Sequence, residues 1–200
     1  MARSALFDRV VQLKLDRARE IVGRRLAEVA QRELDRAVEK YHPTAHRQVV
    51  DGVEGVPLTG AKEVVHFDFS YMRAVVQAAL EQLESTSPVD SGAYVEAHSV
   101  FVNGVQVDDL NNIGMAQRVV ITNHVPYARV IERGIGRHVP WSKQPQVPAE
   151  GVYSHAEKAL RRRFGNVALI KFGWFGFEAG NETGSTVSKN RYPGLSIEAR

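Results

Sequence analysis

The sequence predicts an α+β fold, in which an antiparallel sheet of about four strands is packed by two helices and carries a long N-terminal helix and an extended C-terminal arm. Three observations support this class. Apolar residues recur every three or four positions in several long segments, which is typical of amphipathic helices. They alternate with polar residues in shorter segments, which is typical of half-buried strands. The Asn103-Gly104 pair separates two short segments and is the strongest short signal of a β-hairpin.

The length and composition fit one soluble domain with appendages. The chain has 200 residues, of which 44% are hydrophobic and 24% are charged. A chain of this size buries roughly 70% of its unfolded surface and needs no crosslink to fold. It contains no cysteine. This absence excludes disulfides, thiolate metal sites, iron–sulfur clusters and cysteine nucleophiles, and it fits a reducing compartment.

Residues 4–41 form the first predicted element, an amphipathic helix about 57 Å long. Ser4 is a suitable N-cap, and His42-Pro43 ends the helix because a residue before proline avoids helical geometry. Gly23 lies in the middle, costs about 1 kcal/mol relative to alanine and is compatible with a kink. One stripe carries the apolar positions, which are Val11, Leu15, Ala18, Val22, Leu26, Ala30, Leu34, Ala37 and Tyr41.

The other side of this helix is dense with charged residues. Two interpretations of this pattern stay open. In the first, the charges form a solvated face with ion pairs between residues three and four positions apart. In the second, the helix is an arm that reaches a neighbouring subunit, because it is longer than a single domain of this size needs.

Residues 44–175 are predicted to form the mixed α and β core. The predicted strands, in which apolar residues alternate or β-branched residues cluster, are 63–70, 94–102, 105–107, 118–122 and 167–172. The predicted helices, in which apolar residues have helical spacing, are 71–83, 126–133 and 152–164. Turn-forming residues fill 85–92, and three prolines predict a loop over 134–151.

The chain changes character from residue 176 onward. Residues 178–190 are small and polar, which predicts an extended or mobile arm. Apolar residues return in 191–197, so an arm that docks onto a neighbour and a frayed terminus are equally compatible with the pattern. The predicted organisation is therefore a long helix at 1–43, a core at 44–175 and an arm at 176–200.

The sequence lacks the patterns that most catalytic and metal sites require. It has no Gly-x-Ser-x-Gly elbow, no phosphate-binding glycine loop and no His-Glu-x-x-His motif. His66 and Asp68 share one face of a predicted strand, but no third metal ligand is indicated. Asp90 and Ser91 are adjacent in a turn, where their side chains are expected to bond to the backbone. We predict no catalytic residue, metal ion or cofactor, and a hydrolase using His66, Asp68 and Ser91 is the disfavoured alternative.

Charge and hydropathy limit the classes of partner. No apolar run approaches the roughly 18 to 20 residues of a membrane span, and charges interrupt the apolar stretches near the N-terminus, so neither a membrane partner nor a signal peptide is predicted. The net charge is +3, which permits transient contact with nucleic acid without requiring it.

Two later segments each allow two interpretations. The cluster Arg161, Arg162 and Arg163 fits an exposed helix end that interacts favourably with the helix dipole. It also fits a surface that meets phosphates or an acidic partner, and the alternative function is therefore a basic nucleic-acid-binding protein that uses the arginine-rich helices. The aromatic segment 172–177 fits a stacking platform or a core strand whose glycines mark close backbone approach.

Two segments resemble a known family. These are Pro88-Val89-Asp90-Ser91-Gly92, and the stretch from Asn123 through Pro126-Tyr127-Ala128 to Glu132-Arg133-Gly134. In the same order and at similar spacing, they resemble the neck or tail-completion proteins of tailed bacteriophages, including minor tail proteins of the Z type. The resemblance covers about residues 60–172. The Pro-rich loop after Gly134 is longer than in the shorter members, and the first helix and the last segment lie outside the shared core.

The resemblance implies a structural virion protein without catalysis. Members are expected to form rings at the head–tail junction or the top of the tail, where they stabilise head–tail joining and let DNA pass through the lumen. The implied partners are copies of the chain itself, most simply in a hexamer with twelve-fold symmetry as the alternative at the neck, and other neck, adaptor or tail-tube proteins. The implied location is the virion, with the host cytoplasm during assembly.

The residues of the two motifs have physical roles that suit such a protein. Asp90 is expected to accept backbone N–H bonds and fix the turn, and Gly92 to allow a backbone conformation closed to other residues. Pro126 presets φ at the start of a short helix, and Tyr127 suits a buried edge or an interface. Glu132 is suited to hold an arginine of the same or an adjacent subunit.

Overall fold

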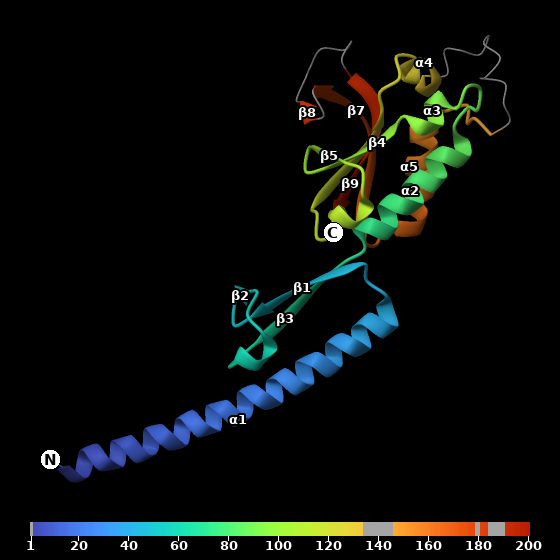
Figure 1. Ribbon diagram of the computed structural model, residues 1–200. Helices are drawn as coiled ribbons and strands as arrows, with labels where there is room; N and C mark the ends of the chain where they lie inside the picture. Colours follow the sequence, from blue (N-terminus) through green and yellow to red (C-terminus); the bar gives the residue numbers. More distant parts are fainter. Residues whose placement is uncertain (1, 134–145, 179–180, 184–190) are drawn as a thin grey trace. The chain divides into compact units, whose positions relative to one another are not determined.

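The computed structural model describes residues 2–133, 146–178, 181–183 and 191–200 (Figure 1). The chain divides into two compact units, Met1–Phe69 and Ser70–Arg200. This division differs from the sequence-based one, because residues 44–69 belong with the long helix and residues from 176 onward belong with the core. Within the described residues, no helix has both the length and the apolar character that a membrane span requires.

The first unit combines the long helix with a small sheet. Its elements are α1 (Ala2–Tyr41), β1 (Ala45–Val50), β2 (Val53–Glu54), the 3₁₀ turn η1 (Leu58–Gly60) and β3 (Val65–Ser70). The three strands form one sheet in the order β2-β1-β3. Asp51 turns the chain between β1 and β2 at a positive φ of 49°. Its carboxylate accepts hydrogen bonds from the backbone N–H groups of Lys62, Glu63 and Val64 at 2.8–2.9 Å, which lower its pKa.

Helix α1 confirms the prediction of a long N-terminal helix and corrects two details. It begins at Ala2, so Ser4 lies inside the helix and is not its N-cap. It continues through Gly23 without a break (Figure 1). Gly23 is buried, and a Cβ there would collide with the backbone carbonyl of Ala61, so the glycine allows close packing of α1 on the η1 segment.

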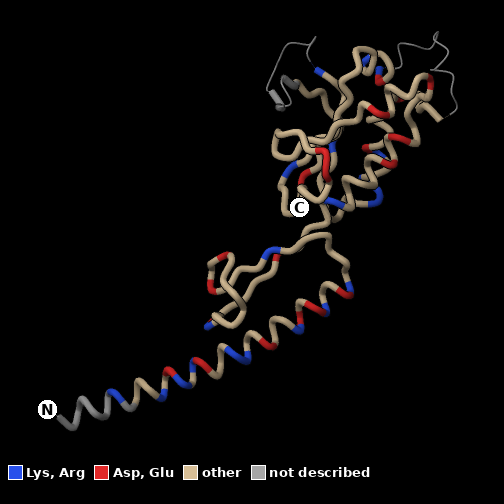
Figure 2. The backbone as a smooth tube through the Cα atoms, in the orientation of Figure 1, with Lys and Arg blue, Asp and Glu red and all other residues tan. Residues whose placement is uncertain are grey.

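The apolar stripe of α1 is buried along only part of its length. Ala30 and Leu34 are buried, whereas Val11, Leu15 and Val22 are exposed. Acidic and basic residues alternate along the helix (Figure 2). Many of them pair within the helix, as in Asp16–Arg19, Glu20–Arg24, Arg25–Glu28 and Glu33–Arg36. These pairs support the interpretation of this side as a solvated, ion-paired face.

The second unit is a small antiparallel barrel covered by helices. Its helical elements are α2 (Met72–Thr86), α3 (Ala93–Glu96), η2 (Leu110–Ile113), α4 (Ala128–Glu132) and α5 (Val152–Phe164). Its strands are β4 (His98–Val102), β5 (Val105–Val107), β6 (Arg118–Asn123), β7 (Ala168–Glu178), β8 (Asn181–Thr183) and β9 (Arg191–Ala199). The strands close in the order β4-β5-β8-β7-β9-β6, and Val100, Ile121 and Leu195 lie in register across β4, β6 and β9.

The core of this unit lies between the barrel and the pair α2 and α5. Both helices pack on β9, and α5 also packs on β7. The apolar face predicted for α2 is buried, and Val75, Val76, Ala79 and Leu83 are each 0% exposed. The α+β class, the antiparallel pairing and the packing of two helices on the sheet are thus confirmed. The barrel has more strands than the predicted four, because the C-terminal residues contribute to it.

The hairpin at Asn103-Gly104 is confirmed. Both residues have positive φ angles, 49° and 89°, which matches the twist of the flanking strands β4 and β5. The predicted strand over 94–102 is wrong for its first four residues, because 94–96 belong to the short helix α3 and Ala97 ends that helix. Gly92, at φ 85°, starts this helical turn, and the N–H of Glu96 donates to its carbonyl at 3.1 Å.

The prediction of a C-terminal arm is wrong for residues 191–199. These residues form β9, which pairs with β6 on one side and β7 on the other. Leu195 and Ile197 are fully buried, and Gly194 lies opposite Gly173 of β7. A Cβ at Gly194 would lie 2.6 Å from the carbonyl oxygen of Ile121, so this glycine marks close backbone approach. The strand predicted at 167–172 is longer than expected, because β7 continues to Glu178. β9 follows β7 and β8 along the chain, so β7 is not the last strand.

Candidate functional site

The two motif segments of the sequence meet at one pocket. A hollow of about 220 Å³ in the second unit is lined by Pro88, Asp90, Ser91, Gly92, Tyr94, Tyr127 and Ile131. The turn after α2 provides the first four residues, and α3 provides Tyr94. Tyr127 directly precedes α4, and Ile131 lies within α4. We call this hollow the Tyr94 pocket.

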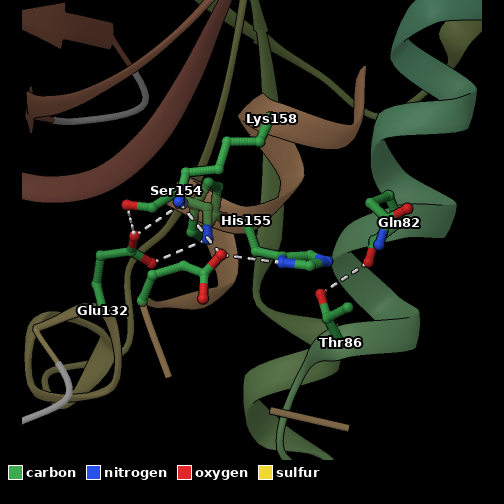
Figure 3. A network of polar contacts seen from close by, with 8 residues as sticks. Gln82, Thr86, Glu132, Ser154, His155 and Lys158 are labelled. Atoms are coloured by element: carbon green, nitrogen blue, oxygen red, sulfur yellow. Dashed lines mark hydrogen bonds and ion pairs between the residues drawn. The ribbon is translucent and has the colours of Figure 1, made fainter. Parts of the chain in front are cut away.

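The turn that carries Asp90 is built by the hydroxyl groups around it. Thr86 Oγ1 donates to the carbonyl of Gln82 at 2.8 Å in the last turn of α2 (Figure 3). Ser87 Oγ donates to the carbonyl of Leu83 at 2.6 Å. Ser91 Oγ accepts a long hydrogen bond of 3.4 Å from the N–H of Ala93. These bonds fix the turn without a contribution from the carboxylate of Asp90.

Asp90 is therefore not the backbone cap that its position in the turn predicted. Its side chain is exposed, and its carboxylate has neither a hydrogen bond nor an ion pair with any residue that the structure describes. The physical reason is that Ser91, and not Asp90, is close to the first free N–H group of α3. Asp90 instead presents a free negative charge at the wall of the Tyr94 pocket.

Tyr94 lines the same pocket from α3. Its side chain is only 3% exposed, and its hydroxyl is buried without a hydrogen-bond partner among the described residues. Its ring lies 6.3 Å from that of Tyr127 and meets His98 edge-on at 5.5 Å. Burial and the nearby charge of Glu132 raise the pKa of this phenol. Tyr94 thus lines the pocket, while its neutral hydroxyl is buried.

Asn123 and Pro126 position the far wall of the pocket. The buried Asn123 amide donates from Nδ2 to the carbonyl of Tyr94 at 2.7 Å and accepts at Oδ1 from the N–H of Val125 at 3.1 Å. Pro126 is exposed and precedes α4, which begins at Ala128. Tyr127 is the residue before the helix, and its side chain is 39% exposed. Asn123 thereby joins the end of β6 to α3.

Glu132 has a structural role that differs from the predicted one. Its carboxylate is buried and accepts bonds from the N–H of Tyr153 at 2.9 Å, the N–H of Ser154 at 2.9 Å and Ser154 Oγ at 2.6 Å (Figure 3). Burial raises the pKa of Glu132, and these hydrogen bonds oppose the rise. The carboxylate therefore caps the positive end of α5, and it binds no arginine among the residues that the structure describes. Gly134, the other predicted end of this motif, lies outside the described residues.

A buried cluster of hydrogen-bonded side chains was not predicted from the sequence. His98 Nδ1 lies 2.7 Å from the hydroxyl of Tyr153, and its Nε2 lies 3.0 Å from Ser87 Oγ. Burial lowers the pKa of His98 to about 4. Because Ser87 Oγ donates to the carbonyl of Leu83 and is fully buried, it is not available as a nucleophile. No spacing in the sequence signals this cluster, since its members come from three separate segments.

The three arginines predicted to face DNA or a partner lie in the last turn of α5. All three are exposed, and none of them lines the Tyr94 pocket. Arg161 pairs with Glu157 at 3.2 Å, and the guanidinium of Arg163 lies 4.7 Å from the ring centre of Phe164. Their position fits the interpretation as a helix end that complements the dipole of α5.

The remaining predicted features concern metal binding and aromatic residues. Asp68 accepts hydrogen bonds from Arg47 and lies 2.8 Å from His66 Nε2, so its carboxylate is engaged in a surface ion pair. Among the described residues, no group of three or more potential ligands is placed to hold a metal ion. The aromatic segment 172–177 belongs to β7, a strand of the barrel, as in the second interpretation of its sequence. The guanidinium of Arg133, which follows α4, lies 5.2 Å from the ring centre of Trp174 in this strand.

Comparisons of the chain with protein-family models, with curated proteins and with solved structures give no match.

Proposed function

We propose that the chain is a structural component of a tailed-bacteriophage virion, which assembles with copies of itself into a ring at the head–tail junction or the top of the tail. The observation that carries this proposal is the meeting of the two motif segments. Pro88–Gly92 and 123–132, the segments that resemble tail-completion proteins, line one pocket. Asn123 of the second segment also donates a hydrogen bond to Tyr94, which lies just after the first segment and lines the same pocket. Their proximity supports treating them as one structural signature.

The long helix supports self-assembly. Part of its apolar stripe, consisting of Val11, Leu15, Ala18 and Val22, has no partner within the first unit, and Leu15 and Val22 are 48% and 57% exposed. Apolar residues at this spacing on an exposed helix favour packing against a complementary helix or groove. A neighbouring copy in a ring is the occupant that the proposal assigns to this stripe.

The charges favour a connector over a dedicated DNA-binding protein. The acidic and basic residues of α1 largely neutralise each other in pairs, as between Glu20 and Arg24 at 3.2 Å. A net charge of +3 is small for a protein that must hold DNA by its phosphates. A ring through which DNA passes needs contacts weak enough to permit transit.

The test is the oligomeric state of the purified full-length chain, measured by native mass spectrometry and negative-stain electron microscopy. We expect discrete closed rings, with six copies as the first expectation. Val22→Glu places a charge on the exposed stripe and is expected to shift the protein toward monomers. Leu13→Glu is the matched control, because Leu13 is 62% exposed on the same helix but lies away from the stripe.

The opposite result would contradict the proposal. A wild-type chain that stays monomeric at every concentration, or equal assembly of Val22→Glu and wild type, argues against a ring formed through α1. Tight binding of short duplex DNA that weakens steeply with salt would favour the nucleic-acid-binding alternative instead.

A further inference from the structure

We propose that the Tyr94 pocket binds the guanidinium group of an arginine side chain presented by another protein chain. The inference concerns a ligand site, and it holds whether or not the chain forms a ring. If the ring proposal is correct, a neighbouring copy supplies the arginine. Three features of the pocket lead to this ligand class, and each is independent of the resemblance to tail-completion proteins.

The first feature is the free carboxylate of Asp90. It lies at the wall of the pocket and has no hydrogen-bonding or ionic partner among the described residues. An unpaired carboxylate beside a hollow favours a cationic ligand, and a guanidinium binds a carboxylate through two parallel hydrogen bonds. The turn does not need this carboxylate, because Ser87 and Ser91 supply the local hydrogen bonds.

The second feature is the orphaned hydroxyl of Tyr94. A buried polar group without a partner costs about 1–3 kcal/mol relative to a satisfied one. This hydroxyl belongs to a residue that lines the pocket, and it is almost completely buried. A ligand that faces Asp90 reaches this oxygen only when the ring of Tyr94 turns toward the hollow, and the ligand then donates one N–H bond to it. A guanidinium has five N–H donors spread in a plane, so it can serve both oxygens at once.

The third feature is the aromatic and apolar wall. Tyr127 is 39% exposed and lines the pocket, and Pro88 and Ile131 add apolar surface to its lining. A guanidinium plane stacks on an aromatic face and is weakly hydrated at its faces, whereas an ammonium is compact and strongly hydrated. This combination of a carboxylate, a hydroxyl and a tyrosine ring therefore favours arginine over lysine.

The experiment uses the full-length chain and three small probes that differ only at the side chain. They are N-acetyl-arginine amide, N-acetyl-lysine amide and N-acetyl-norleucine amide, and saturation-transfer NMR measures their binding in protein assemblies of any size. We expect the arginine probe to bind at least tenfold more tightly than the norleucine probe, with the lysine probe between them.

Two variants connect this binding to the pocket. Asp90→Asn is expected to weaken the arginine probe at least tenfold, and Tyr94→Phe to weaken it severalfold. Neither removes a contact between the residues that the structure describes, because the Asp90 carboxylate and the Tyr94 hydroxyl have no hydrogen-bond partner among them. Asp108→Asn is the matched control, because Asp108 is an exposed aspartate outside the pocket. Its affinity for the probe should equal that of the wild type.

A second measurement distinguishes the source of the arginine. If a neighbouring copy supplies it, the wild-type chain self-associates in analytical ultracentrifugation, and both Asp90→Asn and added arginine probe reduce this association. If another protein supplies it, the probe binds and self-association does not depend on Asp90. Both results support the pocket proposal, and the second does so without supporting a role of the pocket in a ring.

The proposal is overturned if Asp90→Asn changes neither probe binding nor self-association. Equal binding of the arginine and norleucine probes would also overturn it, because the pocket would then select apolar surface and not the cation. A ring that persists in Asp90→Asn, together with probe binding that the substitution leaves unchanged, would leave the proposed function standing while removing the arginine pocket, so the two proposals fail separately.

Discussion

The carboxylate of Glu132 accepts two hydrogen bonds from Ser154, one from its hydroxyl at 2.6 Å and one from its backbone N–H at 2.9 Å. Glu132 is the last residue of α4, and Ser154 lies in the first turn of α5. The pair therefore ties the helix that lines the Tyr94 pocket to the helix that packs on the barrel. The geometry of the pocket depends on this link, even though neither residue lines it.

The hydrogen bonds between Glu132 and the start of α5 predict that Glu132→Gln lowers the free energy of unfolding. The amide keeps the shape of the carboxylate but removes the charge at the N-terminus of α5 and one of its acceptors. We expect a loss of about 1–3 kcal/mol in the free energy of unfolding, measured by urea denaturation. Glu157→Gln, which breaks only the exposed pair with Arg161, should cost less than about 0.5 kcal/mol. Equal costs for the two variants would show that Glu132 does not act as a cap.

Gly151 predicts a second stability effect at the same link. Its φ is 102°, and a Cβ there would lie 2.5 Å from both the backbone oxygen and a carboxylate oxygen of Glu132. Gly151→Ala therefore combines backbone strain with a collision, and we expect a loss of more than about 2 kcal/mol in urea denaturation. Gly114→Ala has a positive φ but open space, so it measures the strain alone. A Gly151→Ala variant that is no less stable than Gly114→Ala would contradict the close approach of Glu132.

His98 predicts a pH dependence of stability. Its pKa is about 4 in the folded chain and near 6.5 when unfolded, so the unfolded chain binds the extra proton between these values. The contribution of His98 is fully present above pH 6.5 and is lost as the pH falls toward 4, by up to about 3 kcal/mol. Glu132 acts in the opposite direction, because burial raises its pKa.

The comparison of wild type with His98→Gln isolates this effect. Urea denaturation at pH 7.5 and pH 4.5 should show a smaller loss of stability for His98→Gln than for wild type, since Glu132 is present in both. Parallel pH profiles of wild type and His98→Gln would show that His98 is not held neutral by burial.

The central position of β9 in the barrel predicts that substitutions of its buried residues destabilise the fold. Ile197 is fully buried and pairs with Val119 of β6 and Ile170 of β7. Ile197→Ala should lower the free energy of unfolding by about 2–5 kcal/mol, measured by urea denaturation. Glu198→Gln, on the neighbouring half-buried position, removes only an ion pair with Arg118 and should change it by less than about 1 kcal/mol. A frayed terminus would make both substitutions neutral.

The sequence predicts the local elements well where one physical signal is sufficient. The helix Val152–Phe164 has the predicted boundaries, because apolar residues at helical spacing are bracketed by Gly151 and Gly165. The hairpin at Asn103-Gly104 follows from the ability of these two residues to adopt positive φ. In both cases the deciding interactions lie within a few positions along the chain.

The sequence does not reveal the interactions that depend on distant partners. Leu195 and Ile197 form too short a pattern to mark a strand, and they become central only because β6 and β7 leave space between them. Glu132 reaches the start of α5 across 21 positions, and the residue expected to fix the turn, Asp90, is left free because Ser91 takes that role. Residues of the two motifs meet at one pocket, but their chemical roles could be read only from the contacts.

The late place of β9 in the chain has a consequence for biosynthesis. During translation, β6 and β7 emerge from the ribosome before residues 191–199, and each of them lacks a neighbour until that last strand is made. Pairing across such a separation is slow, and unpaired strand edges invite aggregation. The barrel therefore closes after its other strands are already synthesised, and nascent chains stalled before residue 191 should depend on chaperones to stay in solution.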